Sequence, residues 1–120
     1  MNDDVIEKLK AACAGLIYPS ETDAPLEVFQ WEKRARSARE EVIMRAGKDQ
    51  QVQEISFEAF FDELKDTDDA ERFAQLCRTI KALLTTVKVY RVGTRRIDVY
   101  VIGDEPGGGW AGLKTISVET

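Results

Sequence analysis

The chain has 120 residues, a length typical of one domain with one core, and we expect a single domain over residues 1–120. Hydrophobic residues make up 43% and charged residues 32%, as in ordinary soluble globular proteins. The net charge of -5 argues against a nucleic-acid-binding surface, because phosphate contacts need a basic patch. The absence of histidine excludes Ser-His and Cys-His catalysis.

No apolar run approaches the roughly 20 residues that a membrane helix needs. The first ten residues, MNDDVIEKLK, are acidic and therefore not typical of a signal peptide. We expect no membrane contact and a cytoplasmic location. Cys13 and Cys77 lie on the apolar faces of predicted helices, which favours buried free thiols over a disulfide.

The first quarter of the chain predicts a helix, a turn and a strand. Apolar residues four apart predict a helix over residues 2–16, and Pro19 stops it. A polar turn at residues 20–25 leads to an alternating segment, 26–32, which is typical of a strand. Its large side chains divide between the two faces, with Phe29 and Trp31 against Leu26 and Val28.

Two serines mark the next helix starts. Ser37 and Glu40 fit a capping box, which predicts a short helix that Gly47 ends. A polar loop at residues 48–51 then leads to a short extended segment at 52–55.

Ser56 fits an N-cap, and the apolar residues after it recur at helical spacing. This aromatic stripe is typical of a buried helix face and comprises Phe57, Phe60, Phe61 and Leu64. A charged turn at residues 65–69 precedes a longer helix over 69–85. Its apolar stripe is Phe73, Cys77, Ile80 and Leu84, flanked by Leu76 and Leu83.

The densest β-type sequence is residues 87–104, VKVYRVGTRRIDVYVIGD, which predicts a hairpin that turns at Gly93. Its second strand is apolar on both faces, and such strands are usually covered on both faces. We therefore predict an α+β fold with helices on each side of a mainly antiparallel sheet. One face carries Ile97, Val99 and Val101, and the other carries Tyr100 and Ile102.

After the hairpin, the segment GDEPGGGWAG predicts a flexible connection, and residues 113–118 alternate weakly as a last strand. The glycines at 107–109 lack the Gly-Lys-Ser/Thr ending and the strand-turn-helix setting of phosphate-binding loops. A mobile hairpin loop is therefore the better interpretation.

Acidic residues offer two interpretations. The pairs Glu21 with Asp23 and Asp104 with Glu105 suit acid-base chemistry, but surface turn acids are commoner, so we predict no enzyme. A further acidic run is either a solvated face or a docking patch for a basic surface. It comprises Asp62, Glu63, Asp66, Asp68, Asp69 and Glu71.

The segment VYRVGTRRIDVYVIGDEPGGGWAGLKTISVET resembles the C-terminal part of the nuclease A inhibitor family, whose pattern is VYR-LG-…-DVYVIGETPAG-…-LAG-…-VET. The segment GLIYPSETDAPLEVFQWE resembles the family's first turn and strand. The resemblance implies a three-layer α-β-α sandwich, similar to pathogenesis-related group 1 proteins.

The same resemblance implies a function: tight 1:1 inhibition of a sugar-nonspecific, Mg2+-dependent DNA/RNA endonuclease, whose basic groove the acidic inhibitor fills. It implies that Thr120, in the ending Val118-Glu119-Thr120, reaches the nuclease's metal, and that Glu21 makes a second polar contact. No cofactor of the protein's own is implied. We also count Glu119, Trp110 and Asp104 as partner-binding candidates.

The chain departs from the family in two places. A longer acidic segment with a partner-contacting tryptophan is replaced by residues 65–69, so that contact is missing; Trp110 either compensates or is core. Arg95 and Arg96 stand at the hairpin tip where the relative is acidic. They would weaken docking if the tip faced a basic groove, and we expect the tip to face solvent. The alternative function is a regulatory or scaffold domain with a non-nuclease partner. A small hydrolase that uses surface carboxylates is the third.

Overall fold

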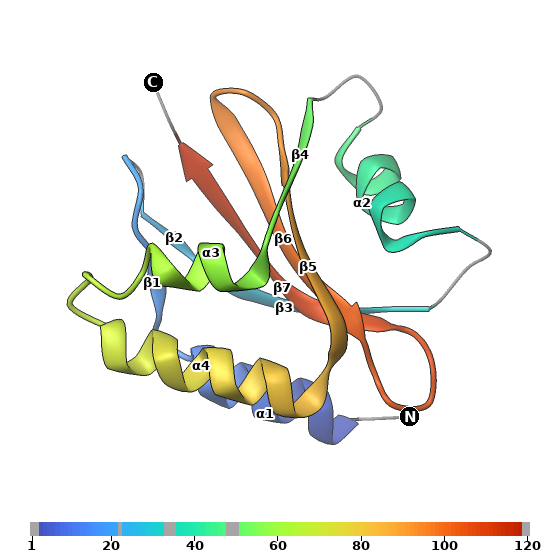
Figure 1. Ribbon diagram of the computed structural model, residues 1–120, viewed down its shortest axis with the longest axis horizontal. Helices are drawn as coiled ribbons and strands as arrows, with labels where there is room; N and C mark the ends of the chain where they lie inside the picture. The colour runs from blue at the N-terminus through green and yellow to red at the C-terminus, as the bar shows by residue number, and fades with distance from the viewer. Residues whose placement is uncertain (1–2, 22, 33–35, 48–50, 119–120) are drawn as a thin grey trace.

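The computed structural model describes residues 3–21, 23–32, 36–47 and 51–118 (Figure 1). Within these segments the protein is α+β, with four helices, a five-stranded antiparallel sheet and a small two-stranded sheet. The helices are α1 (Asp3–Cys13), α2 (Ala38–Ala46), α3 (Phe57–Asp62) and α4 (Ala70–Leu83). The strands are β1 (Ile17–Tyr18), β2 (Ala24–Pro25), β3 (Glu27–Trp31), β4 (Val52–Ile55), β5 (Thr85–Val92), β6 (Arg96–Asp104) and β7 (Trp110–Val118).

The large sheet has the order β3-β7-β6-β5-β4, and each neighbouring pair is antiparallel. The predicted hairpin is confirmed as β5 and β6, and Gly93 turns between them with a φ of 117°. A side chain there would place its Cβ 2.5 Å from the carbonyl oxygen of Arg96, so the turn requires glycine.

The last strand was predicted too short. β7 begins at Trp110 rather than at residue 113, and it pairs with both β3 and β6. Gly112 explains the difference: in sequence it looks like part of a glycine-rich connection, but in the sheet it pairs with Phe29 and Ile102. The smallest residue is needed there because the neighbouring backbone comes very close.

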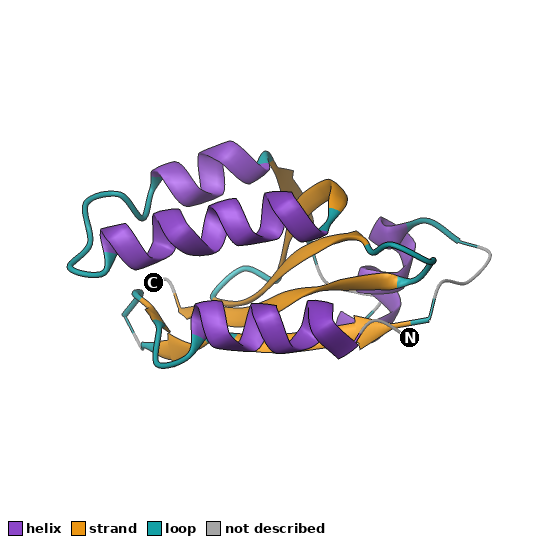
Figure 2. Ribbon diagram, turned by 90° about the horizontal axis from the view of Figure 1, so that it is seen from below, coloured by secondary structure: helices purple, strands orange, loops and turns teal. Residues whose placement is uncertain are grey.

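The sheet separates two hydrophobic clusters, and the predicted division of the hairpin residues is confirmed. Ile97, Val99 and Val101 pack with α1, α3 and α4, whereas Tyr100 and Ile102 pack with α2. The faces predicted for residues 26–31 are confirmed in the same way. Figures 1 and 2 show α1, α3 and α4 together, with α2 apart from them. None of the helices in the described segments is long and apolar enough to cross a membrane.

Helix boundaries differ slightly from the predictions. α1 ends at Cys13, and α4 runs from Ala70 to Leu83 because Leu84 is already extended. The predicted turn at residues 20–25 includes β2, which pairs with β1 as a small hairpin. The predicted loop at 48–51 lies mostly outside the described residues.

The capping box of α2 is confirmed and gives a stability prediction. The Ser37 hydroxyl accepts a hydrogen bond from the amide of Glu40 at 3.1 Å, and the Glu40 carboxylate accepts one from the amide of Ser37 at 3.0 Å. Replacing Ser37→Ala leaves one helix amide without its partner, so the free energy of unfolding should fall by about 1 kcal/mol. Urea denaturation at pH 7 measures this loss, and an unchanged midpoint would contradict it.

The same hydrogen bonds make the contribution of Glu40 to the stability of the fold depend on pH. Hydrogen bonds from the Ser37 backbone and side chain lower the pKa of the Glu40 carboxyl below its ordinary value. A lowered pKa means that the folded state favours the charged carboxylate. The contribution of Glu40 to stability is therefore present above the ordinary glutamate pKa and is lost as the pH falls through the lowered one.

Candidate functional site

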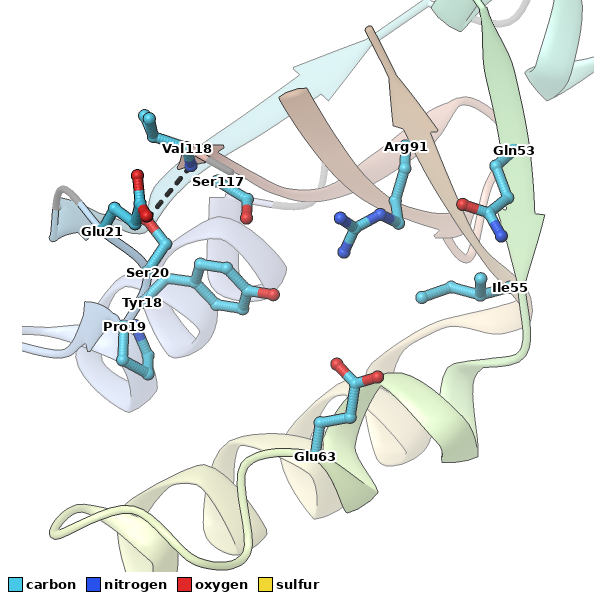
Figure 3. A pocket seen from close by; sticks show the side chains of 10 residues that line it. All are labelled: Tyr18, Pro19, Ser20, Glu21, Gln53, Ile55, Glu63, Arg91, Ser117 and Val118. Carbon is cyan, nitrogen blue, oxygen red and sulfur yellow. Dashed lines mark hydrogen bonds between the residues drawn. The ribbon is translucent and has the colours of Figure 1, made fainter. Parts of the chain in front are cut away.

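The end of β7 is fastened by residues that lie far away in the sequence. The amide of Val118 donates a hydrogen bond to the Ser20 hydroxyl at 3.1 Å, and its carbonyl accepts one from the amide of Glu21 at 3.3 Å (Figure 3). β3 begins at Glu27, which pairs with Lys114, so β3 does not extend to the end of β7. Ser20 and Glu21 bind the same edge of β7 at Val118 instead. The other edge still pairs with β6, where Arg96 faces Val118.

One predicted site residue, Glu21, lies at this end of β7. Glu21 is exposed and lies beside Val118, the last described residue. Glu119 and Thr120 follow Val118 directly in the chain but lie outside the described residues. Val118 is thus the point where Glu21 meets the segment that the family resemblance assigns to the nuclease metal.

Asp104 and Trp110 lie at the opposite end of the sheet, on β6 and β7. They face each other where β6 ends and β7 begins. Because β7 has 9 residues, its two ends are about 27 Å apart. The predicted partner-binding residues therefore divide between two ends of the sheet, and only Glu21 lies at the Val118 end within the described part of the chain.

Trp110 is core rather than a surface contact. It is 2% exposed and packs in the cluster of α2 with Tyr100 and Val42. Of the two sequence interpretations, the structure supports the core one. The partner-binding assignment of Trp110 is corrected accordingly, because a buried indole has no surface to offer a partner.

The glycine-rich connection is a hydrogen-bonded turn between the paired strands β6 and β7, which confirms the predicted hairpin. Gly108 donates its amide to the Glu105 carbonyl at 3.2 Å, and Glu105 donates its own to Gly109 at 3.1 Å. Glu105, predicted as a surface acid, is only 8% exposed because the Gln30 amide on β3 donates to both carboxylate oxygens at 2.9 Å. Asp104 remains half-buried.

A polar cavity of about 670 Å³ opens beside the Val118 end of the sheet. Figure 3 shows Arg91 from β5 and Glu63 from just after α3 extending into the same space. Its walls are Tyr18, Pro19, Ser20, Glu21, Gln53, Ile55, Glu63, Arg91, Ser117 and Val118. Since the lining carries charges of both signs, the cavity by itself does not define the chemistry of a ligand.

Sequence reasoning missed this cavity, although a signal was present. Arg91 follows Val89 on the same face of β5, and Ser117 follows Leu113 and Thr115 on the same face of β7. Polar residues that replace apolar ones in a period-two pattern mark the point where the core gives way to a cavity.

The remaining candidates stay at the surface. All six members of the acidic run are exposed, as the solvated-face interpretation predicts.

Both cysteines are free, and burial raises the pKa of each thiol. The described residues contain no group of three or more acidic or cysteine side chains that could hold a metal ion.

The fold and this end of the sheet together define a small acidic α+β protein in which β7 ends at Val118 beside the backbone of Glu21. The family model described as nuclease A inhibitor-like protein matches residues 3–120, and the chain belongs to that family. The match covers nearly the whole chain and confirms the resemblance found in the sequence. No curated protein gives a match to the chain.

Proposed function

We propose that this protein inhibits a sugar-nonspecific, Mg2+-dependent DNA/RNA endonuclease by binding 1:1 in its basic substrate groove. The observation that carries the proposal is family membership over residues 3–120, together with Glu21 held beside Val118. The protein acts by occupying the groove and catalyses no reaction of its own. It needs no cofactor, and we expect it in the cytoplasm.

Charge supports this proposal. A groove that binds phosphates attracts carboxylates, and long-range attraction of this kind speeds association. The chain carries a net charge of -5, and the exposed carboxylates of Glu21 and Glu63 lie around the Val118 end. We expect these two carboxylates to meet positive charge in the nuclease groove, whereas Arg91 and Arg96 at the same end oppose docking.

The two residues after Val118 would extend this face. The resemblance matches Thr120 to the family threonine that reaches the nuclease's metal. A terminal carboxylate and a hydroxyl are hard oxygen donors, which suit Mg2+. Trp110 is buried and does not replace the missing family tryptophan, so we expect more of the affinity to depend on residues 119–120 and Glu21.

We further infer that the arrangement is the three-layer α-β-α sandwich of pathogenesis-related group 1 proteins. Its support is the packing of α2 on one face of the sheet and of the other three helices on the opposite face.

The direct test adds the purified protein to a nonspecific Mg2+-dependent endonuclease, with DNA and then RNA as substrate. Cleavage of both should fall in parallel, because one groove serves both substrates. The protein alone should cleave neither. Unchanged cleavage at micromolar excess over several such nucleases would favour a scaffold domain with a different partner.

The hairpin tip supplies a charge test of the docking face. Arg95 and Arg96 are exposed, and Arg96 lies directly across from Val118. Two positive charges at that place oppose docking into a basic groove. Replacing both by glutamate should strengthen inhibition by about 3- to 10-fold at low ionic strength, with a smaller gain in high salt.

The inhibition constant measured at two salt concentrations tests this prediction. Replacement of Lys88 or Arg91 is unsuitable as a control, because Lys88 pairs with Glu54 of β4 and Arg91 also has an interaction partner. Replacement of exposed Arg78 on α4 by glutamate changes net charge away from the tip. Arg78→Glu changes the net charge by -2 and the double replacement changes it by -4, so half the gain in binding free energy from Arg78→Glu would show that net charge matters and that the tip does not.

A further inference from the structure

We propose that Ser20 is a positioning residue, which fixes the backbone of Val118, the residue directly before Glu119 and Thr120. The inference rests on the proposed function, because the position of Val118 affects inhibition only if residues 119–120 reach the nuclease. Ser20 itself need not touch the partner.

Both backbone hydrogen-bonding groups of Val118 on one edge are held by consecutive residues. The Ser20 hydroxyl accepts a hydrogen bond from the Val118 amide, and the Glu21 amide donates one to the Val118 carbonyl. Ser20 and Val118 are 98 positions apart in the sequence. Since the amide and carbonyl of one strand residue point to the same edge, the two contacts act on that edge as one clamp. Figure 3 shows Ser20 reaching Val118 directly.

The segment that carries Ser20 and Glu21 is itself held in place by neighbouring strands. Ser20 and Glu21 lie in the connection between β1 and β2, which pair with each other. The Thr115 hydroxyl also donates to the carbonyl of Pro25 at 3.0 Å, so β7 is tied to both sides of this connection. Ser20 is therefore presented to Val118 by a braced segment.

Fixing Val118 before binding removes part of the cost of binding. Ordering the backbone of one residue costs conformational entropy, and strand ends lose order easily when unpaired. A strand end whose last described residue, Val118, is already held pays less of that cost on binding. The replacement Ser20→Ala removes only the side-chain half of the clamp and leaves the Glu21 amide in place.

The test is a cycle of four proteins with N-terminal tags: the intact chain and the chain lacking residues 119–120, each with Ser20 and with Ser20→Ala. In the intact chain the replacement should raise the inhibition constant by about 5-fold. In the shortened chain it should add no further loss, because residues 119–120 are gone. Ser20→Thr keeps the hydroxyl acceptor and should restore most of the affinity.

Ser37→Ala is the matched control. It also removes a serine hydroxyl that accepts from a backbone amide at 3.1 Å, but in α2, outside the cavity lining. It should lower stability without changing the inhibition constant. An equal loss from Ser20→Ala in both backgrounds, or no loss in either, would overturn the positioning role.

A second measurement separates this inference from the proposed function. Amide hydrogen exchange of Val118 in the protein alone should be about 5-fold faster in Ser20→Ala than in the parent chain. Unchanged exchange would overturn the clamp whatever the nuclease result. Faster exchange in a protein that inhibits no nuclease would leave the clamp in place and reject the proposed function.

Discussion

Deletion of Glu119 and Thr120 is expected to weaken nuclease inhibition by at least about 30-fold, which is the loss typical of a central contact in an interface. The proposed docking face consists of Glu21, the Val118 end of β7 and these two residues. The family's tryptophan contact is missing here, and Trp110 is buried, so few other anchors remain to hold the partner. Inhibition constants for the intact and shortened chains give the measurement.

Removal of residues 1–2 is the matched control, because it also shortens the chain by two residues, at the opposite terminus. It should leave inhibition unchanged. Thermal unfolding of both shortened chains shows whether the fold is kept. Equal inhibition by the intact chain and the chain without residues 119–120 would keep the inhibitor function and remove the role of Thr120.

Gly112→Ala is expected to prevent folding or to lower the free energy of unfolding by more than about 4 kcal/mol. A Cβ at this position would lie 1.7 Å from the carbonyl oxygen of Val101 and 2.8 Å from its carbonyl carbon. Both atoms belong to the backbone of β6, so no side-chain rotation relieves the clash. The substitution must separate β6 from β7 at the centre of the sheet.

Gly108→Ala provides the comparison. Nothing lies within 4 Å of a Cβ built there, and only its φ of 98° is unfavourable for alanine. Its cost should be about 1–2 kcal/mol of backbone strain. Circular dichroism of both variants tests whether each one folds, and thermal unfolding compares their stabilities with that of the parent chain. A Gly112→Ala protein with the parent's melting temperature would contradict the described pairing of β6 with β7.

Features with a local cause were predictable from the sequence. The capping box at Ser37, the cap at Ser56 and the turn at Gly93 each depend on residues within a few positions. The two faces of β6 follow from its period-two pattern, and the helix stripes follow from the helical period.

Features with a distant cause were not predictable. Gln30 lies 75 positions from the Glu105 carboxylate that it buries, and Ser20 lies 98 positions from Val118. Gly112 looked like part of a loop because only the approach of β6 explains it as a strand residue. Side-chain pairing across such separations leaves no periodic trace in the sequence, so the clamp emerges only in three dimensions.

The most direct measurement of the docking face is hydroxyl-radical footprinting of the complex with a nuclease, compared with the protein alone. Two exposed prolines report on the two ends of the sheet: Pro19 beside Ser20 and Pro106 in the glycine-rich turn. We predict that nuclease binding protects Pro19 from oxidation and leaves Pro106 as reactive as before. Protection of Pro106 with no change at Pro19 would place the partner at the opposite end of β7 and contradict the account.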